Sequence, residues 1–125
     1  MEKQTYTYDE AFAKSLEYFK GDELAARVWV NKYAVKDSFG NIYEQSPEDM
    51  HWRLANEVAR VEAKYTNGLS AQELFELFDH FKYIVPQGSP MTGIGNDFQV
   101  ASLSNCFVIG MEGAADSYGA IIRID

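Results

Sequence analysis

Cys106 is the only cysteine in the 125-residue chain, and it lies in the apolar stretch QVASLSNCFVIG. A free cysteine usually packs as a small apolar side chain inside a protein. Ser102, Ser104 and Asn105 surround this one with hydroxyl and amide groups, whereas a purely structural strand favours Val, Ile or Leu. The sequence therefore leaves two interpretations open, a packed core residue and a reactive thiol.

Two further stretches could bind a ligand. The segment QGSPMTGIGND, residues 87–97, is rich in glycine and hydroxyl groups, which can present N–H and O–H donors to an anion such as phosphate. The same composition is also typical of a domain boundary, and Gly93-Ile94-Gly95 is too short for a dinucleotide fingerprint. Asp116 and Ser117 look like the N-cap of a helix, and a helix N-terminus can also contact ribose or phosphate.

Composition and charge exclude several classes of protein. A net charge of −8 without a basic cluster argues against a DNA- or RNA-binding surface. No apolar run is long enough to span a membrane, and the polar, acidic start MEKQTYTYDE is unlike a secretory signal. A single cysteine suits the reducing cytoplasm, where we expect this protein. His51 and His80 are far apart in the sequence, so a zinc site is not expected.

Four helices have to position any such site, and their start signals predict them over residues 7–19, 21–34, 46–65 and 70–81. Thr7 and Ser70 each precede a glutamate by three residues, which is the capping-box pattern. Asp22 and Ser46 are the expected N-caps of the other two helices, and Pro47 fits the first helical position.

Apolar periodicity predicts which helix faces are buried. The helix over residues 21–34 is apolar around much of its circumference, so we expect it to be central. A turn is expected at Gly40-Asn41 in the connection that follows. The other three faces consist of Tyr8, Phe12, Leu16 and Phe19; Met50, Leu54, Val58 and Val61; and Leu74, Leu77, Phe78 and Phe81.

The pattern changes after Tyr83. Residues 84–97 hold two prolines and three glycines, so no helix is expected through them. Residues 98–111 are rich in β-branched and aromatic side chains and predict a strand, and a new helix is expected to begin at Asp116. We expect a mainly α protein, with an all-helical domain over residues 1–85 and an incomplete α/β unit over residues 86–125.

The stretch VPQGSPMTGIGNDFQVASLSNCFVIGMEGAADSYGAI resembles the opening of the catalytic α/β barrel in the large subunit of ribonucleotide reductases. The upstream stretch WVNKYAVKDSFGNIYEQSPEDMHWRLANEVARVEAKY is similar to the all-helical N-terminal domain of the same enzymes. Within the family, QGSPM and ASLSNCFV look more like the adenosylcobalamin-dependent class. The resemblance implies that residues 86–125 supply the first strand and helix start of that barrel.

The resemblance also implies roles for individual residues. Cys106 matches the first redox cysteine, which reduces the ribose 2′ position together with a second cysteine. The distance from Cys106 to Asp116 is a few residues longer than in some members of the family. The other matched positions are Ser89 for the substrate diphosphate, Ser104 and Asn105 for the substrate pocket, and Asp116, Ser117 and Tyr118 for the allosteric specificity nucleotide.

The same resemblance implies cofactors and partners. The intact enzyme would use adenosylcobalamin or, alternatively, a metal-containing radical-generating subunit; no cofactor contact is expected in this chain. The expected partners are a ribonucleoside di- or triphosphate substrate, a dNTP or ATP effector, a thioredoxin-like reductant and, if the exposed strand pairs between chains, a second copy in a homodimer.

The chain looks like the N-terminal piece of a longer enzyme. Because Cys106 alone cannot complete the reduction, we expect the 125-residue chain to have no reductase activity by itself. The alternative is a stand-alone helical interaction module with a structural cysteine. A small thiol enzyme is disfavoured, because no histidine base lies near Cys106 in the sequence.

Overall fold

The computed structural model describes residues 4–104 and residue 108. Over these residues no strand is present, and only two isolated antiparallel bridges occur, Tyr6 to Ile42 and Lys36 to Ile42. The prediction of a mainly α protein is confirmed for this part of the chain. The helices are α1 (Tyr8–Tyr18), α2 (Glu23–Lys32), α3 (Pro47–Glu62), α4 (Ala71–Phe78), the 3-10 turn η1 (Asp79–Phe81) and α5 (Gly88–Gly93).

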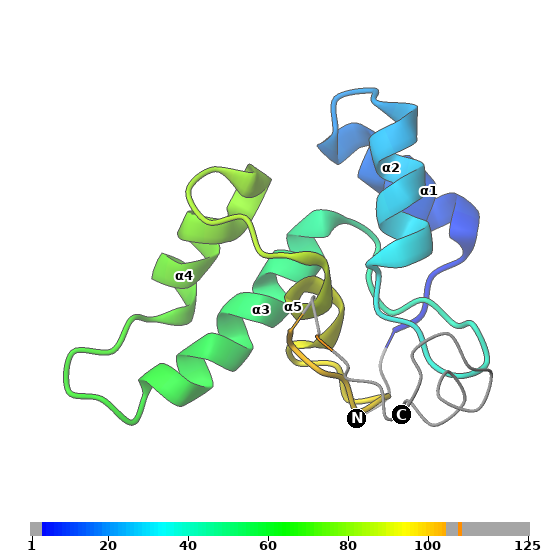
Figure 1. The fold of residues 1–125 in the computed structure, drawn as a ribbon. Helices are drawn as coiled ribbons and strands as arrows, with labels where there is room; N and C mark the ends of the chain where they lie inside the picture. The colour runs from blue at the N-terminus through cyan, green and yellow to red at the C-terminus, as the bar shows by residue number, and fades with distance from the viewer. Residues whose placement is uncertain (1–3, 105–107, 109–125) are drawn as a thin grey trace, which may run out of the picture.

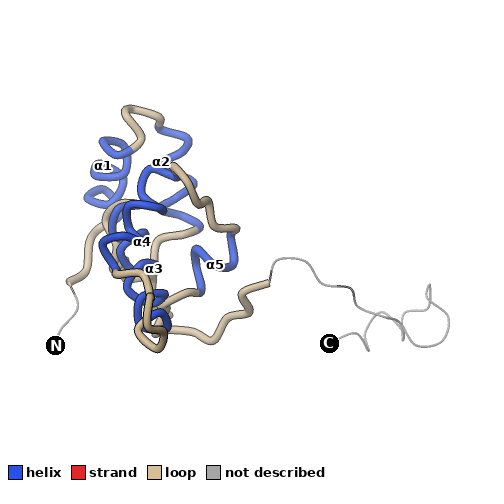
Figure 2. The backbone as a smooth tube through the Cα atoms, turned by 90° about the vertical axis from the view of Figure 1, so that its left-hand side faces the viewer, coloured by secondary structure: helices blue, strands red, loops and turns tan. Residues whose placement is uncertain are grey.

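The helices are arranged as two pairs. Figure 1 shows α1 beside α2 and α3 beside α4, with the short α5 near α3, whose Arg53 binds the carbonyl of Met91. Lys20 and Gly21, both at positive φ, reverse the chain between α1 and α2. Figure 2 shows the same helices turned by 90°, joined by loops and without a strand among the residues described. The longest helix, α3, contacts both the first pair and its own partner α4.

The helix starts follow local side-chain chemistry. Thr7 forms the predicted capping box with Glu10, and Asp22 accepts a hydrogen bond from the Ala25 amide at 3.1 Å. Ser70 accepts one from the Glu73 amide at 3.2 Å. Ser46 occupies the predicted N-cap position of α3, but its side chain makes no capping hydrogen bond. Pro47 instead begins that helix with a fixed φ and no N–H to satisfy.

This difference between two N-cap serines gives a testable prediction. Ser70→Ala removes a capping hydrogen bond and is expected to lower the free energy of unfolding by about 1 kcal/mol. Ser46→Ala removes no such bond, and we expect a loss below about 0.5 kcal/mol. Urea denaturation of both variants measures the difference, and equal losses would contradict the assignment of the caps.

The centre of the hydrophobic core lies on α3, where Met50, Leu54 and Ala55 are completely or almost completely buried. Trp29 of α2 packs against this face, and its indole N–H donates to the thioether of Met50 at 3.3 Å. The remaining buried members of the core come from every other helix except η1 and from the loop after α2: Ala11, Val30, Ala34, Ile42, Leu74, Phe78 and Met91.

Three predictions of buried faces are wrong in part, and on α3 the difference is Val61, which is 41% exposed. The buried residues of α1 are Ala11 and Ser15, while Tyr8 is 42% exposed. The hydroxyl of Ser15 donates to the carbonyl of Gln45 at 3.2 Å, so this side of α1 faces the loop that leads into α3. The expectation that α2 is central holds for Ala26, Trp29 and Val30, which are buried, but not for Leu24, which is 70% exposed. This outer face of α2 borders an apolar cleft of about 360 Å³.

The region after α4 also differs from expectation. Helix α5 forms over Gly88–Gly93, where no helix was expected. Pro90 is its third residue, and a proline is tolerated in the first turn because the N–H groups there have no intrahelical partner. The strand predicted over residues 98–111 is not seen over residues 98–104. Of its other positions, all but residue 108 lie outside the described residues, as does the predicted helix start at Asp116.

Candidate functional site

Helix α5 carries Ser89, the predicted diphosphate contact. Ser89 is the second residue of α5 and is partly buried. The hydroxyl of Thr92 donates to the carbonyls of Gly88 and Ser89, at 3.2 and 3.3 Å, which closes the helix on itself. Buried Met91 attaches the same helix to the hydrophobic core. The sequence placed Ser89 in a loop; the structure places it on a short helix with a fixed tertiary contact.

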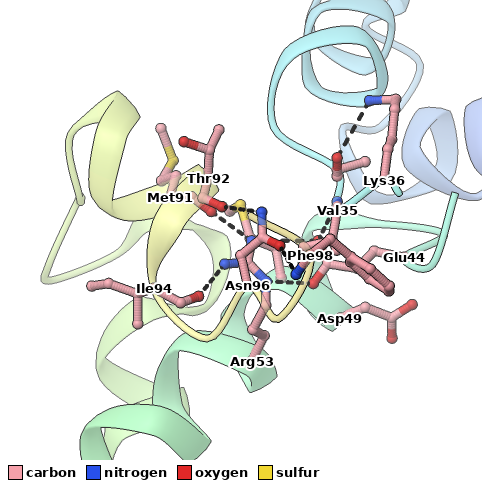
Figure 3. A network of polar contacts seen from close by, with 12 residues as sticks. Val35, Lys36, Glu44, Asp49, Arg53, Met91, Thr92, Ile94, Asn96 and Phe98 are labelled. Carbon is pink, nitrogen blue, oxygen red and sulfur yellow. Dashed lines mark hydrogen bonds and ion pairs between the residues drawn. The ribbon is translucent and has the colours of Figure 1, made fainter. Parts of the chain in front are cut away.

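A polar network holds the C-terminal end of α5 (Figure 3). Arg53 of α3 extends its guanidinium toward this end and donates through Nη2 to the carbonyl of Met91 at 2.5 Å. Its Nη1 donates to the carbonyl of Ile94, and its Nε donates to the carboxylate of Glu44 at 2.9 Å. One arginine therefore connects α3, α5 and the loop between α2 and α3.

Glu44 completes this network from the loop after α2. Its side chain is 7% exposed and that of Arg53 is 11% exposed. The second carboxylate oxygen of Glu44 accepts a hydrogen bond from the Val35 amide at 3.1 Å. Burial raises the pKa of Glu44, although the attraction of Arg53 acts in the opposite direction. The pair is thus strongly desolvated, and each partner depends on the other for its hydrogen bonds.

The chain after α5 packs closely onto the same arginine. Gly95 has φ +71°, and a Cβ at this position would lie 2.9 Å from the Cγ of Arg53. The Asn96 side chain donates to the carbonyl of Thr92 at 3.0 Å, and the ring of Phe98 stacks on Tyr43 at 4.6 Å. A cleft of about 190 Å³ lies here, lined by Val35, Tyr43, Glu44, Arg53, Gly95, Asp97 and Phe98.

The segment that precedes Cys106 returns to α5. A Cβ at Gly93 would lie 3.0 Å from the Cδ2 atom of Leu103 and 3.2 Å from the Cβ of Ala101. The structure thereby brings the neighbourhood of Ser104 next to the helix that carries Ser89. Ser104 itself is exposed, and its amide donates to the Ser102 hydroxyl at 3.3 Å. The other predicted site residues, Asn105, Cys106, Asp116, Ser117 and Tyr118, lie outside the described residues.

A second polar cluster joins α1, α3 and η1. The hydroxyl of Tyr18 donates to Asp79 at 2.9 Å and accepts from the amide of His80 at 2.6 Å. Nδ1 of His51 lies 3.4 Å from that hydroxyl and 3.6 Å from the Asp79 carboxylate. Burial lowers the pKa of His51 to about 4, so its ring is neutral at physiological pH.

The two histidines that are far apart in the sequence therefore contact the same tyrosine, since His80 stacks on the ring of Tyr18 at 4.4 Å. Within the described part of the chain, Nε2 of His51 has no hydrogen-bond partner. Residues 4–104 contain no group of three or more His, Cys, Asp or Glu side chains that could hold a metal ion. We interpret this cluster as a structural connection between helices.

The helices and the network around α5 define an all-α domain. The residues that precede Cys106 in the sequence, Ala101 and Leu103, lie close to Gly93 of α5. Comparison with known families identifies the domain: the family model described as ribonucleotide reductase, all-alpha domain, matches residues 19–93. The match covers more than half of the chain and includes Arg53, Glu44 and Ser89. The chain belongs to this family, whose enzymes are oxidoreductases. No curated protein and no solved structure matches it.

The family match bears on the resemblance noted in the sequence. It confirms the all-helical part and extends through α5 to Gly93, eight residues beyond the expected domain boundary at residue 85. Ser104 and Cys106 lie after the matched residues, so their roles belong to the proposal below. Within the described residues, no helix has the length and apolar character needed to cross a membrane.

Proposed function

We propose that this chain is part of the large subunit of a ribonucleotide reductase, which converts ribonucleotides to 2′-deoxyribonucleotides. The observation that carries the proposal is the family match over residues 19–93, which leads directly into the segment that holds Cys106. The helical domain of residues 1–85 would precede the first strand of the catalytic barrel within residues 86–125. The charge of −8 is compatible with an enzyme of free nucleotides and not with a nucleic-acid-binding surface.

In this proposal Cys106 is one of two redox cysteines. The C2′–OH bond breaks and the hydroxyl leaves as water, while C2′ gains a hydrogen. Two thiols lose two electrons and two hydrogens in total and become a disulfide, which balances the reaction. A thioredoxin-like reductant then restores the thiols. The sequence contains one cysteine, so the second redox thiol and the thiyl radical that abstracts the 3′-hydrogen belong to other parts of the enzyme.

The remaining predicted residues hold nucleotides. Ser89 on α5 contacts the substrate diphosphate, and Ser104 with Asn105 lines the substrate pocket near Cys106. The return of residues 101–103 to α5 supports this arrangement, because it brings the segment before Cys106 close to the helix of Ser89. For the allosteric specificity nucleotide, the contacts are Asp116, Ser117 and Tyr118.

The radical generator is adenosylcobalamin or, alternatively, a metal-containing partner subunit. Whichever cofactor is used would supply the radical, and the residues of this chain would hold the substrate and one reducing thiol.

Replacement of Cys106 tests the proposal. In the whole reductase, Cys106→Ser is expected to abolish turnover driven by an external dithiol, while Ser102→Ala should retain it. The isolated 125-residue chain, supplied with cofactor and dithiol, is expected to form no deoxyribonucleotide. Product formed by the isolated chain, or full turnover by Cys106→Ser, would refute the role of Cys106. The latter result would favour a structural role for Cys106.

A further inference from the structure

Helix α5 depends on tertiary contacts for its position. It has six residues, and an isolated helix of this length is not stable in water. Two contacts stabilise it: the Thr92 hydroxyl donates a hydrogen bond to the Gly88 carbonyl, and Met91 is buried in the core. The carbonyls of Met91 and Ile94, near its C-terminal end, are held by the guanidinium of Arg53. This arginine is therefore a polar attachment of α5 to the helical domain.

Arginine is suited to this role in a way that lysine is not. Its planar fork donates at the same time to two carbonyls and to the carboxylate of Glu44, from three different nitrogens. Glu44, fixed in turn by the Val35 amide, sets the orientation of that fork. A lysine ammonium would keep the positive charge beside Glu44 but could not reach both carbonyls in this geometry.

Gly95 provides independent evidence that the segment after α5 packs closely on the side chain of Arg53. Its positive φ and the absence of a Cβ allow the chain to pass directly over the aliphatic stem of Arg53. Any side chain at this position would meet Cγ of Arg53 at 2.9 Å. Arg53 is thus enclosed from one side by Glu44 and from the other by the segment after α5, which fixes the position of that segment as well.

We propose that Arg53 is a positioning residue for the substrate site: it fixes α5 on α3 and thereby determines where Ser89 meets the substrate diphosphate. This inference rests on the proposed function, in which Ser89 contacts that group. Arg53 touches no substrate atom; its guanidinium is occupied by Glu44, Met91 and Ile94. The ligand class is a ribonucleotide with a charged phosphate chain, and Arg53 acts on its affinity only through Ser89.

Amide hydrogen exchange tests the positioning step without any substrate. In Arg53→Lys, the amides of Met91, Ile94 and Asn96 are expected to exchange at least about tenfold faster, because local opening of α5 becomes easier. The amide of Leu54 in α3 should keep its protection. Arg60→Lys is the matched control, since Arg60 lies on the same helix and pairs only with Glu57 in the structure described. Unchanged exchange at α5 in Arg53→Lys would overturn the inference.

Kinetics of the whole reductase test the step to Ser89. Arg53→Lys and Ser89→Ala are each expected to raise the KM for the ribonucleotide about tenfold with little change in kcat, since each loses a contact worth that factor. The KM of the double variant should exceed the higher of the two single-variant KM values by no more than about twofold, because both changes act on the same contact. A merely structural role of Arg53 would make the two effects multiply, and that result would overturn the inference.

A second variant leaves the guanidinium intact. Gly95→Ala forces the segment after α5 away from Arg53 and should reproduce both the faster exchange and the higher KM.

The kinetic outcomes distinguish the role of Ser89 in the proposed function from the positioning role of Arg53. If Ser89→Ala leaves the KM unchanged, the role of Ser89 in the proposed function is wrong, even where exchange at α5 responds to Arg53→Lys. If Ser89→Ala raises the KM and Arg53→Lys does not, the positioning role is wrong and the proposed function stands.

Discussion

Replacing Glu44 by alanine is expected to lower the free energy of unfolding by about 3–5 kcal/mol, the range for breaking a buried ion pair by removal of one partner. The loss is large because Arg53 would remain desolvated without its counter-charge, and the Val35 amide would lose its acceptor. Burial raises the pKa of Glu44 despite the attraction of Arg53, which is consistent with a strongly desolvated pair. The pair is therefore costly to break, although its formation contributes little net stability.

Glu57→Ala is the matched control for this prediction. Glu57 also pairs with an arginine of α3, Arg60, but that arginine is 64% exposed. Exposed pairs three or four residues apart on a helix contribute about 0.2–0.5 kcal/mol, so the control should lose no more than this. Urea denaturation of the two variants, with the m-value compared, gives both numbers. Similar losses in Glu44→Ala and Glu57→Ala would show that the Arg53 network is not desolvated as the structure indicates.

Lowering the pH from 7.5 to 5 is expected to reduce the stability by about 2 kcal/mol through His51 alone. The pKa of this ring falls from an ordinary 6.5 to about 4 in the folded protein, chiefly because of burial. The unfolded chain then binds the proton more readily than the folded one, so stability is full above pH 6.5 and is lost between pH 6.5 and 4. Asp79 opposes the shift, while His80 and Arg53 add to it.

The chain contains two histidines, which makes the measurement clean. His80→Gln leaves His51 as the only imidazole, and the NMR titration of its ring should give a pKa near 4 with the pH-dependent loss of stability retained. His51→Gln should remove most of that loss. The raised pKa of Glu44 changes the stability with pH in the opposite direction to His51. The stability of each histidine variant is therefore compared with that of the unchanged protein at the same pH. A His51 pKa near 6.5 would contradict the buried position.

Helix starts were predictable because they depend on a few neighbouring residues. Thr7, Asp22 and Ser70 cap their helices through side chains, and each signal is complete within four residues. Buried faces were less predictable, because they depend on which helices meet. Tyr8 is exposed although it fits the apolar stripe of α1, whereas Ala11 and Ser15 are the buried residues of that helix.

The candidate site was predictable only where a family motif exists. Ser89 and Ser104 came from such a motif, and the structure brings their segments together through α5. The Arg53 network leaves no comparable signal, because its hydrogen bonds join residues 38 and 41 positions apart. One clue was available: Arg53 lies between Met50 and Leu54 on the turn that forms the centre of α3, where an unpaired arginine would not be tolerated.

The hydrogen bond from Trp29 to Met50 provides an optical reporter of this domain. It crosses from the first helical pair to the second, and Trp29 is almost fully buried. The other indole, Trp52, stacks on Phe75 within the second pair. Fluorescence of a Trp52→Phe variant therefore reports separation of the two pairs, and its transition can be compared with loss of helical circular dichroism. Coincident transitions would mean that the pairs unfold as one cooperative unit.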